Sequence, residues 1–178
     1  MTALYILTKI LTFPGAYLRG FWEHLTCKTL GLPVEKPGYL RIDEACGHVE
    51  HGLAKKGFDA YLMATGPGFM NFMTGFPIFL VGYINLFLLG IRPSDSIILF
   101  IVYVLFTYVG ISLLCNIFPL IEDAMNNFDV AYSQKKMNVI GRIFFYIPSL
   151  ITSLGARLER YGVTVILWIA FIVLSFMV

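Results

Sequence analysis

Charged residues are scarce in this chain of 178 residues, of which 13% are charged and 58% are hydrophobic. A soluble domain of this size has about a quarter charged residues. The net charge of +2 comes from basic residues that form no phosphate-binding stripe, so nucleic acid is not an expected partner. The composition predicts one membrane domain, residues 1–178, surrounded by membrane lipids and open to contact with other membrane helices.

Several common signatures are also missing. The sequence has no glycine-rich phosphate loop, no GxSxG motif and no intact HExxH motif. The three cysteines are an odd number, which indicates no disulfide framework. Lys9 and Pro14 interrupt the first apolar stretch and do not fit a secretory signal peptide, so we expect this segment to be retained.

The apolar runs predict an all-α polytopic membrane protein with about four membrane helices, because a span needs about 20 apolar residues. A shorter interfacial helix and a small polar hairpin loop complete the prediction. The expected spans are residues 4–30, 64–91, 97–121 and 156–178, with the polar loop at 35–56 and the interfacial helix at about 139–154.

Local signals refine the helix ends. Pro14 predicts a kink in the first span, and Gly31 predicts its end. Gly66-Pro67-Gly68 is typical of a turn before the second span. Asp95 or Ser96 is expected to cap the third span.

Lysine and arginine predict the orientation. Six lie in residues 19–56 and five in residues 135–160, but the turn between the second and third spans has only Arg92. The positive-inside rule places the two basic segments in the cytoplasm and both termini outside.

All three histidines, His24, His48 and His51, lie within 28 residues of one another. Cys46-x-His48-x-x-His51 offers soft ligands at short spacing, which zinc or another transition metal accepts. His24 is a further candidate ligand, and zinc is the candidate cofactor. The alternative is a solvated polar hairpin without a metal.

Arg19 and Glu23 are four residues apart and would share one helix face. Glu122 and Asp123 directly follow the clearest span, where they could end a helix at the headgroups or turn inward toward Arg19 and Glu23. The purely structural alternative for Arg19 and Glu23 is an interfacial ion pair that anchors the helix. Asn85 and Asn116 lie within predicted spans and are expected to bond between helices.

Three segments together resemble the site-2-protease-like integral membrane metallopeptidases. Phe13-Pro14-Gly15 and the helix up to Gly31-Leu32-Pro33-Val34 are similar to the family's first core helix, which contains the HExxH-type motif. Gly47-His48-Val49-Glu50-His51 resembles a hairpin of some bacterial members, and Phe118 to Ala124 resembles a later segment with a ligand aspartate. The resemblance implies an intramembrane zinc peptidase scaffold in the cytoplasmic membrane of a prokaryote.

The match departs from the family at the catalytic residues. It puts Arg19 at the first zinc histidine, Gly20 at the catalytic glutamate and Glu23 at the second histidine, while Asp123 matches the aspartate. A zinc hydrolase needs three ligands and a general base. The main hypothesis is therefore a degenerate, non-hydrolytic member, a pseudo-peptidase in which an ion-pair cluster of Arg19, Glu23 and Asp123 replaces the metal.

Two alternatives remain from the sequence. One is an active metal-dependent peptidase with non-standard ligands, namely His24, His48, His51 and Asp123. The other is a small transporter or channel subunit that uses Glu122, Asp123 and Arg142.

Overall fold

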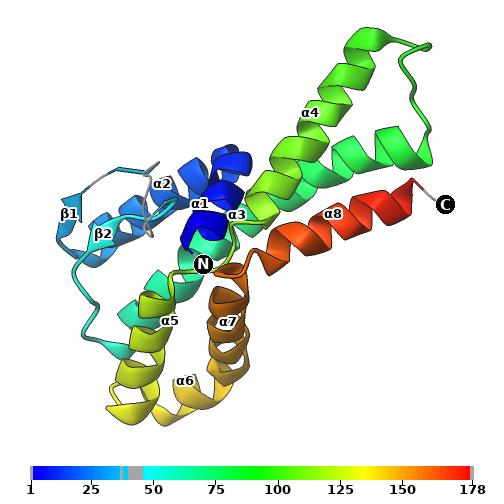
Figure 1. The fold of residues 1–178 in the computed structure, drawn as a ribbon. Helices are drawn as coiled ribbons and strands as arrows, with labels where there is room; N and C mark the ends of the chain where they lie inside the picture. The colour runs from blue at the N-terminus through cyan, green and yellow to red at the C-terminus, as the bar shows by residue number, and fades with distance from the viewer. Residues whose placement is uncertain (1, 37, 40–45, 177–178) are drawn as a thin grey trace.

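The computed structural model describes residues 2–36, 38–39 and 46–176, and it is mostly helical (Figure 1). The described residues form eight α-helices, two π-helical turns and one two-stranded hairpin. The helices are α1 (Thr2–Leu11), α2 (Phe13–Leu30), α3 (Gly57–Tyr83), α4 (Ile97–Leu114), α5 (Ile121–Phe128), α6 (Val139–Phe144), α7 (Tyr146–Glu159) and α8 (Val163–Ser175), with π-turns η1 (Ile84–Leu88) and η2 (Asp129–Ser133).

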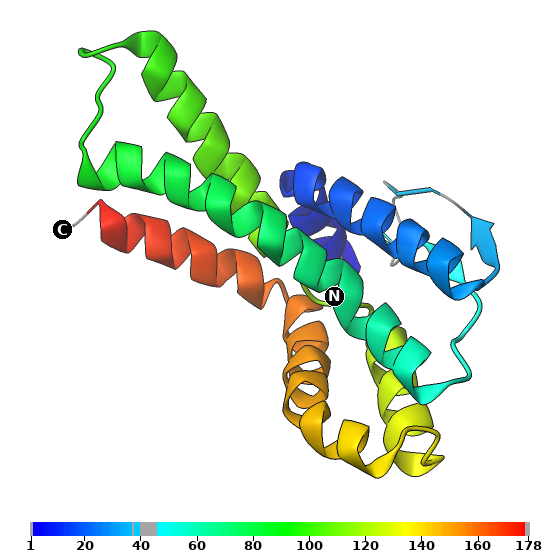
Figure 2. The same ribbon diagram turned by 180° about the vertical axis from the view of Figure 1, so that it is seen from behind.

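Helices α3 and α4 form the longest part of the molecule, and they diverge toward the loop that joins them (Figures 1 and 2). Where they pack, glycines let the backbones approach: a Cβ on Gly110 would lie 2.5 Å from the Phe79 backbone. Ser96 caps α4 by accepting a hydrogen bond from the Leu99 amide, as predicted. Helix α8 lies along α3 and reaches its far end, where the Tyr83 and Ser175 hydroxyls are 3.1 Å apart.

Two helices within the described residues are long and apolar enough to cross a membrane: residues 57–88, where η1 continues α3, and α4. A third span is possible if α7 and α8, which are bent by 85° relative to each other, are counted as one. The structure thus supports two to three membrane helices. The predicted spans at 64–91 and 97–121 correspond to the first two helices with different ends.

The predicted span at 4–30 is two helices rather than one. Helix α1 ends at Leu11, and Pro14 lies in the first turn of α2. Proline has no N–H to donate to the preceding turn, so the chain breaks where only a kink was predicted. Gly31 ends α2 in a left-handed conformation with φ 67°, as predicted.

The predicted span at 156–178 is divided as well. Helix α7 already begins at Tyr146 and takes in most of the predicted interfacial helix, whose first part is α6. Gly162 has φ 69° and separates α7 from α8. The glycine permits the left-handed residue that redirects the chain.

Two local predictions are wrong. Pro67 lies inside α3, so Gly66-Pro67-Gly68 is helix and not a turn. Glu122 and Asp123 do not close α4, because α4 ends at Leu114 and both acids lie in the first turn of α5. Acidic residues are favoured there by the helix dipole.

The polar loop contains a small antiparallel hairpin of β1 (Val34–Lys36) and β2 (Glu50–His51). Val34 pairs with His51. The alternation of residues 39–42 predicts a short strand, but all of these residues except Tyr39 lie outside the described part of the chain. The hairpin runs beside α2 (Figure 1), which brings the histidines of the loop to that helix.

Candidate functional site

Glu23 is the centre of the candidate site and has 0% of its surface exposed. Its Oε2 atom accepts a hydrogen bond from Nδ1 of His48 at 2.8 Å. Its Oε1 atom accepts one from the Val49 amide at 3.0 Å. The start of β2 thus fixes the carboxylate from two directions, which is the arrangement that a buried charge requires.

Arg19 lies one helical turn before Glu23 and is also fully buried. Its Nε atom is 3.6 Å from Glu23 Oε2, and its Nη1 atom donates a hydrogen bond to the Ile117 carbonyl at 2.9 Å. The predicted ion pair is therefore present, and it is buried rather than interfacial. The Arg19 Nη2 atom has no hydrogen-bond partner among the described residues.

His51, and not Arg19, connects Glu23 to Asp123. Its Nε2 atom is 3.7 Å from Glu23 Oε1 and 3.6 Å from Asp123 Oδ1. The described residues contain no ion pair between Arg19 and Asp123, so the predicted three-residue cluster is corrected to a chain of four. We call Arg19, Glu23, His51 and Asp123 the charge cluster.

The other predicted site residues have different surroundings. The Nδ1 atom of His24 is 2.8 Å from the Tyr39 hydroxyl, so His24 is a partner of Tyr39 and not of the cluster. Cys46 is buried with 1% exposure, and His48 is occupied by Glu23. Glu122 is exposed. The predicted Cys46, His48 and His51 ligand set is thus not the group that the structure brings together.

The ligand atoms that lie within 4.8 Å of one another belong to Glu23, His51 and Asp123. Two carboxylates and one imidazole are a set that zinc accepts. Two neighbours argue against a hydrolytic zinc centre. The Arg19 guanidinium repels a divalent ion at this distance from Glu23. Gly20 supplies no general base, and even a Cβ there would lie 3.0 Å from the Tyr39 side chain.

The pKa values of Glu23 and His51 are shifted in opposite directions. Burial raises the pKa of the Glu23 carboxyl, but the charge and hydrogen bond of His48, the Arg19 charge and the Val49 amide lower it to about 2. Burial lowers the pKa of His51, but its interactions with Asp123, with smaller contributions from the Gly52 carbonyl and Glu23, raise it to about 9. Near neutral pH both shifts favour the charged forms, the carboxylate of Glu23 and the imidazolium of His51.

These shifts predict a pH dependence of stability. The raised pKa of His51 stabilises the fold fully below its ordinary value of 6.5, and this contribution is lost as the pH rises through about 9. The lowered pKa of Glu23 stabilises the fold above its ordinary value of 4.5 and is lost as the pH falls toward about 2. Denaturant unfolding of the wild type should show the alkaline loss, and His51→Gln should reduce it. An unchanged alkaline slope in His51→Gln would contradict the assignment.

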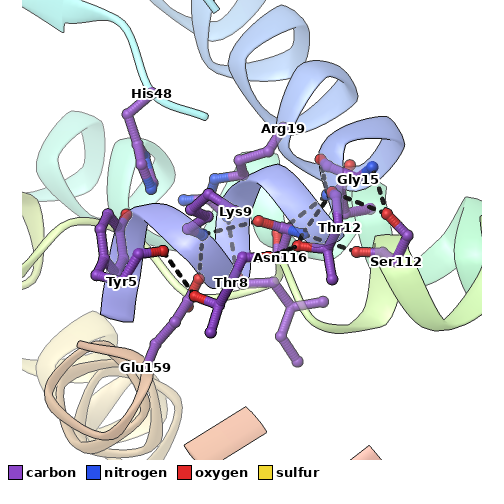
Figure 3. A network of polar contacts seen from close by, with 12 residues as sticks. Tyr5, Thr8, Lys9, Thr12, Gly15, Arg19, His48, Ser112, Asn116 and Glu159 are labelled. Carbon is purple, nitrogen blue, oxygen red and sulfur yellow. Dashed lines mark hydrogen bonds and ion pairs between the residues drawn. The ribbon is translucent and has the colours of Figure 1, made fainter. Parts of the chain in front are cut away.

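A second buried polar network lies beside the charge cluster and was not predicted (Figure 3). The Lys9 ammonium donates to Asn116 Oδ1 at 2.7 Å and forms an ion pair with Glu159. The Asn116 amide group also donates to Thr12 Oγ1 at 2.9 Å and to the Ser112 carbonyl. The network joins α1, the end of α4 and α7. Asn116 thus bonds between helices, as predicted, whereas the Asn85 amide group donates to the Val81 carbonyl one turn earlier in the same helical segment.

The sequence carried one signal for this network, a lysine inside an apolar stretch. A lysine at that place needs an anionic partner. The partner, Glu159, is 150 residues away, so its identity could not be recognised from spacing.

A cavity of about 710 Å³ opens against both networks. His51 and Asp123 line it from the charge cluster, and Tyr5 and Glu159 line it from the second network. The cavity thus adjoins α1, β2, α5 and α7.

Comparison of the chain with protein-family models, with curated proteins and with solved structures finds no match. Any function of this protein therefore has to be inferred from its fold and from the geometry of its site.

Gly68 of α3 makes room for Arg19. A Cβ at this position would lie 1.7 Å from the Ile117 carbonyl oxygen and 2.6 Å from Arg19 Nη1. We expect Gly68→Ala to lower the free energy of unfolding by about 1–3 kcal/mol or more, as overpacking does. Gly66→Ala is the matched control, because no atom lies within 4 Å of its Cβ position. Equal unfolding midpoints for the two variants would contradict this packing.

Proposed function

We propose that the protein is a non-hydrolytic membrane protein with the layout of a site-2-protease-like metallopeptidase, in which the charge cluster replaces the metal centre. One observation carries the proposal. Arg19, at the position that the resemblance gives to a zinc histidine, is fully buried and lies 3.6 Å from Glu23. A fixed guanidinium supplies positive charge at this place without a metal ion.

The other cluster residues support the same proposal. His51 lies between Glu23 and Asp123 at distances of 3.7 Å and 3.6 Å, where a cation would otherwise hold the two carboxylates together. The ion pairs of Arg19 and His51 can thus hold α2, the hairpin and α5 together without a metal ion. A buried arrangement of this kind needs each charge to have a partner of opposite sign, and each member of the charge cluster has one within 4 Å.

The position that the resemblance gives to the catalytic glutamate is occupied by Gly20, which makes binding, rather than hydrolysis, the proposed activity. Gly20 has no side chain to activate water, and Tyr39 occupies the space beside it. The cavity next to His51 and Asp123 would then hold a ligand or part of another membrane helix without cleaving it. We place the basic segments on the cytoplasmic side of a prokaryotic membrane, with α3 and α4 in lipid.

The test combines metal analysis with a cleavage assay. The protein purified without chelators is expected to contain no stoichiometric zinc and to leave peptides and unfolded membrane substrates intact. Arg19→Ala, which removes the competing cation, should raise zinc affinity relative to the wild type. Chelator-sensitive cleavage by the wild type would overturn the proposal, and so would stoichiometric zinc that is lost in both His51→Ala and Asp123→Asn.

The second candidate is a metal-dependent peptidase, and one observation favours it. The ligand atoms of Glu23, His51 and Asp123 are within 4.8 Å of one another. His51 and Asp123 are among the ligands predicted from the sequence, whereas His24 bonds to Tyr39 and His48 bonds to Glu23. The same metal analysis separates the two candidates.

A further inference from the structure

The cavity has a size suited to a small organic molecule. Its volume of about 710 Å³ lies within the range of about 300–1,000 Å³ that is typical of ligand pockets. It adjoins the charge cluster on one side and the Lys9 network on the other. A molecule in it would contact groups from the hairpin, α5 and α7.

The charged groups around the cavity are mostly anionic. Arg160 and His51 are the basic groups among its described lining residues. The carboxylates in the lining are Glu35, Glu50, Glu122, Asp123 and Glu159. A cavity with an excess of one charge concentrates ligands of the opposite charge.

Glu159 gives this cavity a built polar group rather than a loose acidic surface. The residue is 5% exposed and lines the cavity. One carboxylate oxygen pairs with Lys9, while Oε2 has no hydrogen-bond donor among the described residues. The buried ion pair with Lys9 thus fixes this part of the cavity wall.

The rest of the wall is apolar. Val49, Leu53, Leu120 and Ile121 line the same cavity as the carboxylates. A ligand that satisfies both parts of the wall has a cationic head and a short hydrocarbon tail. Metal ions satisfy only the carboxylates, and neutral alcohols satisfy only the apolar wall.

We infer that the cavity binds an organic ammonium cation with a short apolar tail. The inference deepens the proposed function, because it names the ligand class that the non-hydrolytic site would retain. It depends on Glu122 and Glu35 as the acceptors around the ammonium group, with Leu53 and Ile121 against the tail.

The test is calorimetric titration of the whole protein in zwitterionic lipid nanodiscs. Hexylammonium is the probe, and hexanoate and hexanol have the same tail with a different head. We expect saturable binding of hexylammonium at least about tenfold tighter than that of hexanol, and no binding of hexanoate. Glu35→Gln/Glu122→Gln changes two exposed carboxylates and should weaken hexylammonium about tenfold or more.

Asp95→Asn is the matched control, because it removes an exposed carboxylate in the α3–α4 loop, away from the cavity. It should leave hexylammonium affinity unchanged. Equal binding of hexylammonium and hexanol would overturn the inference, as would unchanged affinity in the Glu35→Gln/Glu122→Gln variant. Displacement of hexylammonium by tighter-binding Ca²⁺ or Mg²⁺ would also overturn it and would mark an inorganic cation site.

The two proposals fail in different ways. If the folded protein contains no metal and cleaves no substrate but does not bind hexylammonium, the inferred ligand class is wrong and the proposed function still stands. Chelator-sensitive hydrolysis would reject the proposed function, whatever the titration shows.

Discussion

Glu23→Gln is expected to lower the free energy of unfolding by about 3–5 kcal/mol, the typical cost of removing one partner of a buried ion pair. The substitution keeps the shape of the side chain and its ability to accept from the Val49 amide, but it removes the negative charge. Arg19 and His51 would then lie near each other without the anion that separates them. Two buried cations next to an uncharged amide are strongly disfavoured.

Denaturant unfolding at neutral pH measures this effect. Glu122→Gln is the matched control, because it makes the same chemical change at an exposed carboxylate and should alter stability by no more than about 0.5 kcal/mol. Replacing both members of the pair, in Arg19→Met/Glu23→Leu, should recover part of the loss, because the Arg19 cation is removed together with its anion and His51 keeps Asp123 as a partner. A Glu23→Gln variant as stable as Glu122→Gln would reject the charge cluster.

Lys9→Met is expected to cause a loss of similar size, about 3–5 kcal/mol, because it leaves Glu159 buried without its cation. Methionine preserves most of the volume and the apolar contacts of the lysine stem, so the loss reports mainly on the charge. Asn116 would also lose the donor to its Oδ1 atom. The packing of α1 against α7 should be affected most, since Lys9 and Glu159 join these two helices.

A double-mutant cycle tests this pair. Glu159→Gln in the Lys9→Met background should cost much less than Glu159→Gln alone, with a coupling of about 0.5–3 kcal/mol. Lys55→Met, at an exposed lysine, is the control and should be nearly neutral. Additive losses would show that Lys9 and Glu159 do not act as a pair.

Local sequence signals predicted several features of the fold. Arg19 and Glu23 share a helix face because their spacing of four is the helical repeat. Ser96 and Gly31 mark helix ends because capping depends on one residue and its nearest neighbours. The two long apolar helices follow from their runs of uncharged residues. Each of these predictions needed only a short window of sequence.

The contacts that form the candidate site could not be found in such a window. His51 meets Asp123 only because the hairpin and the start of α5 come together beside α2. Lys9 and Glu159 meet across 150 residues. The sequence showed that these ionisable residues needed partners, but the packing of the helices decided which partners they found.

The wrong span boundaries have a simpler cause. Hydropathy measures how apolar a segment is, and it does not show whether the backbone is continuous. Pro14 and Gly162 break the helical path within two apolar stretches. The run at residues 97–121 likewise ends as a helix at Leu114, before its apolar composition ends.

The tight contact between Gly20 and Tyr39 has an evolutionary consequence under the proposed function. A Cβ at residue 20 would lie 3.0 Å from Tyr39, whose hydroxyl is held 2.8 Å from His24. A glutamate at this position would therefore require the Tyr39 side chain to shift. A hydrolytic site of the family's kind would also need other residues at Arg19 and Glu23, so under the proposed function no single substitution would restore hydrolysis.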